Sequence, residues 1–130
     1  MQSGALMFLA SAVISAMTVA ATPAEAQLIA YHYDGVYSGG APPAPGLSDR
    51  SCRALPLTRI DIENGILRAW DGGRQSVKGF VTHDGFFNAD YYFPGRRGVV
   101  FEGVIDTGGR LSGGIFDGGC AFVIEMTKAQ

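Results

Sequence analysis

Glycine-rich turns separate short apolar segments along most of this chain, and they limit its fold more than any other feature. Residues 103–126, GVIDTGGRLSGGIFDGGCAFVIEM, hold two such turns between three segments with the length and alternation of β-strands. Upstream, Asn64-Gly65 separates LTRIDIE from ILRAW and is the dipeptide most typical of a two-residue hairpin turn. Helical spacing of apolar residues is not sustained after residue 26. The sequence therefore predicts consecutive antiparallel strands.

The register of each hairpin follows from the side chains that it brings opposite one another. A two-residue turn at Asn64-Gly65 sets Ile62 opposite Leu67 on an apolar face, whereas a three-residue loop would move Arg68 into the core. Loops chosen by the same criterion predict further apolar pairs: Val81 with Phe87, Ile105 with Leu111, Phe101 with Ile115, Ile115 with Phe122, and Leu111 with Met126.

The other face of the first hairpin carries charged side chains. Its register predicts an ion pair between Asp61 and Arg68 and a cation–π contact between Arg59 and Trp70. Both contacts are expected at the surface, where each stabilises the hairpin only weakly.

Several glycines fall on the apolar side of the expected strands, where a side chain would otherwise pack: Gly35, Gly79, Gly103 and Gly113. Glycine at such positions permits sharp coiling of a sheet, with neighbouring aromatic side chains covering the gap. We expect about eight strands, the first within residues 28–39 with Tyr33 and Tyr37 on one side. Coiling over that number of strands favours an all-β antiparallel meander that closes into a small barrel or bends tightly. Closure would pair the first strand with the last.

The amino-terminal segment has the pattern of an export signal. Residues 5–21 carry no charge, and Ala24-Glu25-Ala26 is a cleavage site of the small-x-small type. Residues 1–4 lack the usual Lys or Arg. The alternative is an uncleaved membrane anchor, for which the apolar stretch is short. We favour a signal peptide at residues 1–26, followed by a single β domain at residues 27–130.

Charge and cysteine content indicate the setting of that domain. The chain holds ten Lys and Arg against twelve Asp and Glu without a basic stripe, and this argues against nucleic acid or a membrane as partner of the mature protein. In an oxidising compartment Cys52 and Cys120 are expected to form a disulfide. Two free thiols in a cytosolic protein are the alternative. We expect a periplasmic or secreted monomer.

Two features are candidates for binding. Residues 39–49, GGAPPAPGLSD, predict a loop with polyproline II character, either a spacer or a docking segment. Several aromatic side chains face away from the predicted core: Trp70, Phe80, Phe86, Tyr92 and Phe116. These five are our candidate ligand-binding residues. We expect the proline-rich loop and the mature amino terminus to cover the patch of Phe80, Phe86, Tyr92 and Phe116, and the alternative is an open interaction surface.

No catalytic or metal-binding pattern stands out. His32 and His83, with Asp34 and Asp84 beside them, lack the convergent spacing of a zinc site. The carboxylate pairs Asp84 with Asp90 and Glu102 with Asp106 have the spacing of ordinary solvent-facing positions on strands. Arg96-Arg97 is read as a solvated turn rather than an anion site. We therefore expect a protein that is not an enzyme and holds no metal or cofactor.

Short motifs at the two ends of the domain resemble a group of small exported bacterial β-sheet proteins of unknown function. The motifs are YDGVYSG at residues 33–39, Cys52, Asp84-Gly85 and GCAF at residues 119–122. In that group a DGxYxG start and a GCxF/W end bracket a glycine-punctuated meander, and the Trp common in the first strand is Tyr33 here. The resemblance implies an exported β domain with one disulfide and carries over no site residues.

Together these features predict a non-enzymatic exported β-barrel-like module. Its expected partner is a small ligand or a component of the cell envelope, because barrels of this kind often hold ligands at their mouth. The alternatives are a protein-interaction or inhibitor module that uses the proline-rich loop and the outer aromatic side chains, and a hydrolase with an unrecognised site.

Overall fold

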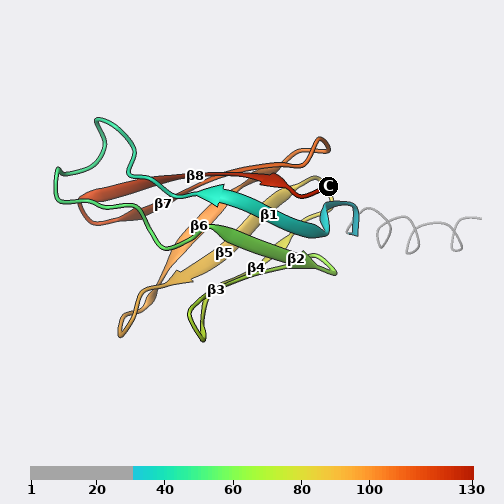
Figure 1. The fold of residues 1–130 in the computed structure, drawn as a ribbon, viewed down its shortest axis with the longest axis horizontal. Helices are drawn as coiled ribbons and strands as arrows, with labels where there is room; N and C mark the ends of the chain where they lie inside the picture. The colour runs from blue at the N-terminus through green and yellow to red at the C-terminus, as the bar shows by residue number, and fades with distance from the viewer. Residues whose placement is uncertain (1–30) are drawn as a thin grey trace, which may run out of the picture.

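The computed structural model describes residues 31–130, which form a closed β-barrel (Figure 1). The predicted signal peptide lies outside the described residues. A 3-10 turn, η1 (Tyr31–Tyr33), precedes eight strands: β1 (Gly35–Gly40), β2 (Arg59–Glu63), β3 (Ile66–Asp71), β4 (Arg74–Val81), β5 (Phe86–Tyr92), β6 (Gly98–Ile105), β7 (Arg110–Asp117) and β8 (Cys120–Lys128). The predicted all-β fold is confirmed.

Each strand pairs antiparallel with its neighbours in sequence, and β1 also pairs with β8. At this seam Gly39 lies opposite Met126 and Tyr37 opposite Lys128. The seam leaves the barrel without a free strand edge, which removes the unpaired backbone groups that make open sheets prone to aggregation. Of the two architectures that the sequence allowed, the closed barrel is the one observed.

The predicted registers are confirmed at the apolar pairs named above. Ile62 lies opposite Leu67, and the remaining pairs are also cross-strand partners: Val81 with Phe87, Ile105 with Leu111, Phe101 with Ile115, Ile115 with Phe122, and Leu111 with Met126. All of these side chains are buried in one core. Gly85 and Gly109 have positive φ angles, 89° and 87°, as loops of this type require.

Two outward contacts of the first hairpin differ from the prediction. Asp61 and Arg68 are cross-strand partners, but Asp61 forms its ion pair with Arg59, whose Nε lies 2.8 Å from Asp61 Oδ1. The two residues are next-but-one neighbours on β2 and so share a face of the sheet. A register shift in β3, between Ala69 and Trp70, interrupts the regular pairing with β4 and sets Trp70 opposite Gln75. The Arg59–Trp70 cation–π contact is not formed; in residues 31–130 the cation–π contact is that of Arg96 with Phe93.

The first strand is shorter than expected and begins at Gly35. Gly35 has a φ of 151°, a conformation that favours glycine, and the chain before it curls into η1. The Asp34 carboxylate accepts hydrogen bonds from the backbone N–H groups of Asn64, at 2.7 Å, and Gly65, at 3.1 Å. Asp34 thereby fastens the start of the domain to the β2–β3 turn. Only the tertiary fold brings this acceptor to the turn.

Tyr37 is buried on β1, and its hydroxyl donates a 2.7 Å hydrogen bond to the carbonyl oxygen of Tyr33. Burial, followed by the negative charge of Asp34, raises the pKa of Tyr37 from 10.0 to about 12. Between these values the unfolded chain loses the proton that the folded chain retains. Stability should therefore be intact below pH 10 and fall as the pH rises through 10 toward 12.

We expect the urea midpoint of unfolding to fall between pH 10 and 11, with a loss of up to about 1.4 kcal/mol per pH unit. The Tyr37→Phe variant is the control, because it keeps the ring and has no proton to lose. Its midpoint should be lower at pH 8 but depend less on pH than that of the unmodified protein. Parallel pH profiles for the two proteins would contradict the assignment.

Three of the inward glycines, Gly79, Gly103 and Gly113, lie where adjacent strands approach each other closely. Gly103 on β6 faces Gly113 on β7, and a Cβ added at either position would lie 2.9 Å from the Phe87 Cζ atom. The Phe87 ring meets the Phe101 ring edge to face, with centroids 4.9 Å apart. The aromatic side chains thus fill the space beside the glycine pair, as the sequence predicted.

The loop between β1 and β2 lies along the start of β8, at the end of the barrel away from the carboxyl terminus (Figure 1). The Ala44 N–H donates to Ala121 O at 2.7 Å, and the Val123 N–H donates to Pro42 O at 3.0 Å. The Cys52–Cys120 disulfide is confirmed and anchors the loop to the same strand. The predicted loop includes Gly39 and Gly40, but both belong to β1 because their backbone pairs with β8.

Candidate ligand-binding site

Alternation along β4, β5 and β6 sorts their side chains into a buried face and an exposed face. Cross-strand pairing then places the exposed side chains in rows. Phe80 lies opposite Asn88, and Asn88 lies opposite Glu102. In the neighbouring rows Lys78 lies opposite Asp90, and Phe86 opposite Val104. Apolar and polar side chains are therefore neighbours on the outside of the barrel.

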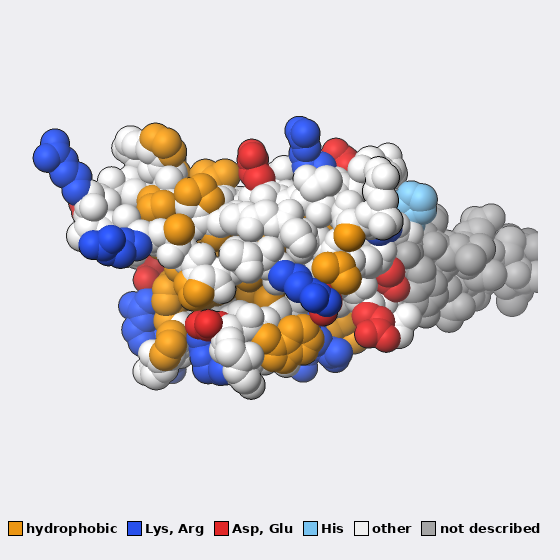
Figure 2. Space-filling model, in the orientation of Figure 1, with side chains coloured by type: hydrophobic (Ala, Val, Ile, Leu, Met, Phe, Trp, Pro, Cys, Tyr) orange, Lys and Arg blue, Asp and Glu red, His pale blue; other side chains and the backbone are white. Residues whose placement is uncertain are grey.

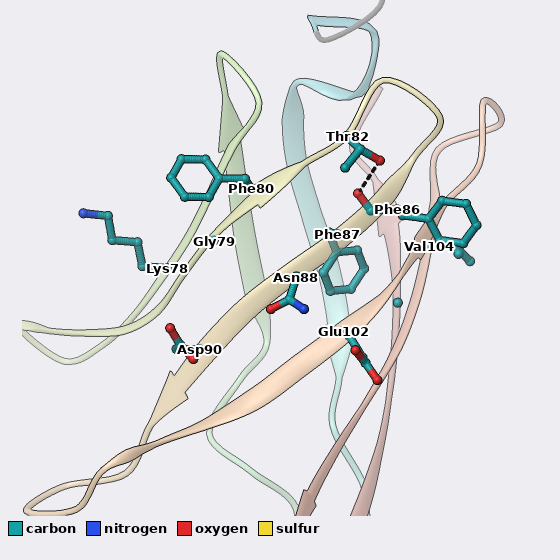
Figure 3. Close-up of a pocket in the computed structure, with 11 residues that line it drawn as sticks. Lys78, Gly79, Phe80, Thr82, Phe86, Phe87, Asn88, Asp90, Glu102 and Val104 are labelled. Carbon is teal, nitrogen blue, oxygen red and sulfur yellow. Dashed lines mark hydrogen bonds between the residues drawn. The ribbon is translucent and has the colours of Figure 1, made fainter.

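These rows line a hollow of about 660 Å³ on the outer face of β4–β6, which we call the outer hollow (Figure 3). Gly79 and Gly103 have no side chains, so they contribute only backbone to it. Figure 3 shows Asn88 between Phe80 and Phe86, whose rings extend to opposite sides. Asp90 and Glu102 lie beyond Asn88, on the side away from Thr82. The volume of the outer hollow is in the range of small-molecule sites.

The β4–β5 turn closes one end of the outer hollow and is held by hydrogen bonds. The Gly85 N–H donates to Thr82 O, and the Thr82 N–H donates to Phe86 O at 2.7 Å. The Thr82 hydroxyl is within reach of Phe86 O, at 3.1 Å (Figure 3), and of the Asp84 carboxylate. The hydrogen bond from Thr82 holds the pKa of Asp84 below its usual range. The turn therefore presents a charged tip beside the outer hollow.

The five predicted aromatic residues are all on the surface, but the structure brings only two of them together. Phe80, 64 % exposed, and Phe86, 56 % exposed, line the outer hollow. Trp70 lies with Arg59 and Asp61 at a separate hollow of about 340 Å³. Figure 2 shows hydrophobic side chains in separate groups on the face drawn, with charged side chains between them.

Tyr92 and Phe116 lie apart from the outer hollow. Tyr92 ends β5 opposite Gly98, and its carbonyl oxygen accepts a 2.6 Å hydrogen bond from Arg74 Nη1. Phe116 is on β7 opposite Ala121. Neither contributes to the lining of the outer hollow.

The expectation that the proline-rich loop covers the outer aromatic side chains is wrong. The loop bonds to β8, and Phe80, Phe86 and Phe116 are each more than half exposed. The loop takes that course because residues 41–57 place Ala41, Leu55 and Leu57 in the core and Cys52 on Cys120. These three apolar side chains are thus used inside the barrel rather than over the outer face of β4–β6.

The polar residues of the outer hollow were not recognised from the sequence. In the sequence, Asp90 and Glu102 stand out only as halves of other carboxylate pairs, and no motif marks Lys78 or Asn88. The hairpin register that sets Val81 opposite Phe87 also sets Phe80 opposite Asn88, so that part of the site was readable. Glu102 joins it through the β5–β6 pairing.

The structure offers less support for a metal site, a membrane-spanning helix or an anion site. Within residues 31–130, no three His, Cys, Asp or Glu side chains come close enough together to hold a metal ion. In that same part of the chain, no helix has the length and apolar character needed to span a membrane. Arg96 is not a free anion-binding group, since its Nη2 lies 2.7 Å from Asp117 Oδ2 and its guanidinium stacks on Phe93.

The geometry defines a small up-and-down β-barrel with a filled core and a ligand-sized hollow outside it. Comparisons with protein-family models, curated proteins and solved structures found no match. One fold serves many functions, so the barrel by itself assigns none.

Proposed function

We propose that this protein is an exported, non-enzymatic β-barrel module that binds a small ligand or a component of the cell envelope in the outer hollow. The observation that carries the proposal is a hollow of about 660 Å³ flanked by two exposed phenylalanine side chains. Large apolar side chains left exposed beside convergent polar groups are typical of binding surfaces. The barrel interior is occupied by core side chains, so the proposal concerns the outer face rather than the barrel mouth.

A binding role suits the side chains that line the outer hollow. They include an amide, two carboxylates and an ammonium group, from Asn88, Asp90, Glu102 and Lys78, but no His or Cys. The Thr82 hydroxyl has no histidine among the lining residues to act as its base. Groups of this kind orient a ligand by hydrogen bonds. We propose that they do so without transforming it and without a cofactor.

The same proposal places the protein in the periplasm or outside the cell, as a monomer related to the exported group that its terminal motifs resemble. The Cys52–Cys120 disulfide supports an oxidising compartment. We expect export to remove residues 1–26, because the small-x-small site precedes Gln27. Native mass spectrometry of the protein secreted by a bacterial host should give a mass that begins at Gln27 and is two hydrogens below the reduced form. An intact leader or free thiols would contradict export.

A second candidate is a protein-interaction or inhibitor module. Leu47 on the proline-rich loop is 71 % exposed and Phe116 is 68 % exposed. Both lie near the start of β8, since Ala121 pairs with Phe116 and bonds to Ala44 in the same loop turn as Leu47. A partner protein held there would contact the loop rather than the outer hollow.

The two candidates are separated by one binding experiment. We expect envelope fractions of the host, separated into saccharide, lipid and peptide pools, to shift backbone amide NMR signals of β4–β6. The double variant Phe80→Ala/Phe86→Ala should lower the affinity measured from these shifts at least tenfold, because both side chains flank the outer hollow. Phe116→Ala is the matched control: it removes an equally exposed ring elsewhere and should leave the response unchanged.

Each of the contrary results has a definite meaning. Shifts that are confined to β8 and the proline-rich loop, and lost in Phe116→Ala, would favour the interaction module. No shift of β4–β6 with any pool would refute the outer hollow as a binding site. Chemical conversion of a pool component by the pure protein would refute the non-enzymatic assignment.

A further inference from the structure

The outer hollow combines two kinds of surface that few ligands match together. Phe80 from β4 and Phe86 from β5 flank it with exposed apolar rings that extend to opposite sides. Between and beyond them lie Asn88, Asp90 and Glu102, whose planar polar ends accept hydrogen bonds in fixed directions. A matching ligand needs an apolar face and, around it, an edge of hydrogen-bond donors.

From this combination we infer that the ligand of the outer hollow is a saccharide without negative charge, either neutral or amino-bearing. The inference rests on the proposed function and names its ligand class. A pyranose ring presents C–H groups on its faces, which pack on aromatic rings, and hydroxyl groups around its edge. Those hydroxyls donate to the carboxylates and the amide oxygen of the hollow.

The acceptors of the outer hollow are available to a ligand. In residues 31–130 neither Asp90 nor Glu102 forms an ion pair or a side-chain hydrogen bond, and Asn88 has no side-chain hydrogen bond. All three side chains are exposed, so they bond to water in the absence of a ligand. A polyhydroxylated ligand replaces those waters with its own hydroxyl groups, which conserves the hydrogen bonds.

Charge excludes the acidic ligands of similar size. Asp90 and Glu102 outnumber the ammonium of Lys78, so the lining of the outer hollow is net negative. A phosphate or a uronic acid would meet two carboxylates and gain at most one cation. An amino sugar would instead bring a positive or neutral group to these carboxylates.

Two other classes of ligand fit the structure poorly. An extended peptide binds a sheet by adding a strand to a free edge, but β4, β5 and β6 are each paired on both sides. A lipid chain needs a continuous apolar channel. In the outer hollow the cross-strand partners Asn88 and Glu102 interrupt the apolar lining. The saccharide is the class that uses both the rings and the polar row.

Defined probes test the inference on the disulfide-bonded chain that begins at Gln27. Chitotriose and cellotriose are titrated into the ¹⁵N-labelled protein, with trigalacturonate as the acidic probe. Micelles of a zwitterionic short-chain phosphatidylcholine and a trialanine peptide serve as non-saccharide probes. We expect chitotriose or cellotriose to shift the amides of Gly79, Asn88 and Gly103, and trigalacturonate to bind at least tenfold more weakly.

Variants connect the result to the side chains. Phe80→Ala/Phe86→Ala should lose at least tenfold in affinity for the bound trisaccharide, and Phe116→Ala should lose none. Glu102→Gln keeps the shape and an acceptor oxygen but removes one charge. This variant should therefore reduce the difference in affinity between trigalacturonate and the neutral probe.

Some outcomes overturn the saccharide class and others the site. If micelles or trialanine shift the same amides and the saccharides do not, the saccharide inference is overturned while the outer hollow remains a binding site. If trigalacturonate binds as tightly as the neutral probe, the charge argument is overturned. If no defined probe shifts these amides, the saccharide inference fails, and the titration with envelope fractions decides separately whether the proposed function stands.

Discussion

Replacing Gly103 with alanine is expected to destabilise the barrel by about 3 kcal/mol or more, although the change adds a single methyl group. The new Cβ would overlap the carbonyl oxygen of Ser112 and lie 2.6 Å from Gly113 Cα and 2.9 Å from Phe87 Cζ. Two of these neighbours are backbone atoms of β7 that are held in the ladder by hydrogen bonds. They cannot move without separating β6 from β7. The measurement is the midpoint of urea unfolding, followed by tryptophan fluorescence.

Gly114→Ala provides a matched control one strand away. A Cβ at Gly114 would meet only Phe122 O, at the ordinary contact distance of 3.6 Å, and its φ angle is not in the positive range. Alanine has a lower entropic cost of ordering than glycine within a strand, so this variant should be neutral or more stable by up to about 1 kcal/mol. Equal losses in the two variants would show that β6 and β7 are not in the close approach described above.

Removal of the disulfide should lower stability by about 4 kcal/mol, the largest single effect expected in this domain. Cys52 and Cys120 are separated by 68 positions, so the bond restricts a long segment of the unfolded chain. For a domain of this size the loss corresponds to a fall in Tm on the order of 20 °C. We expect it in the Cys52→Ala/Cys120→Ala variant and, to a similar extent, in the unmodified protein treated with reductant.

The native structure indicates where the disulfide-free protein opens first. Without the bond, the proline-rich loop remains attached to β8 through hydrogen bonds such as those of Ala44 and Val123. These amides should exchange with deuterium faster than those of β4–β6. Ser51→Ala, an exposed change beside Cys52, is the control and should leave Tm within about 2 °C. If the Tm of the double variant falls by less than about 5 °C, the attachment of the loop contributes little to the stability of the barrel.

Most of the barrel was predictable because each hairpin is encoded by its own turn residues and by the alternation of the strands beside them. Asn64-Gly65 favours a two-residue turn, and the apolar alternation around it allows only the register that buries Ile62 with Leu67. The same reasoning held for the hairpins at Gly85 and Gly109. A wrong register by one residue would have exposed a whole row of apolar side chains.

The errors concern contacts that no local pattern encodes. The sequence suggested that residues 28–39 continue as one strand, but Asp34 is drawn to the β2–β3 turn and the strand begins at Gly35. The hairpin register predicts an ion pair of Asp61 with Arg68 on the opposite strand, but Asp61 pairs with Arg59 on its own strand. Surface ion pairs have small energies, so short-range geometry decides between competing partners.

The candidate site was predictable in part. Alternation places Phe80 and Phe86 outside the barrel, and it places Trp70, Tyr92 and Phe116 there equally well. Which of them share a hollow depends on the curvature of the sheet across β4–β6. Sheet curvature arises from many small contributions, including the close approach at the inward glycines, and a single-strand pattern does not contain it.

The sequence by itself determined most of the strands, their order and their inward faces, because turns and alternation act over a few residues. It also indicated the disulfide, because the chain has two cysteines. The tertiary structure alone decided the course of the proline-rich loop and the addition of Glu102 to Phe80 and Asn88 around one hollow. These outcomes depend on the closure of β1 on β8 and on the coiling of three adjacent strands. Both are cooperative properties of the whole sheet, in which each strand's position is set by its two neighbours.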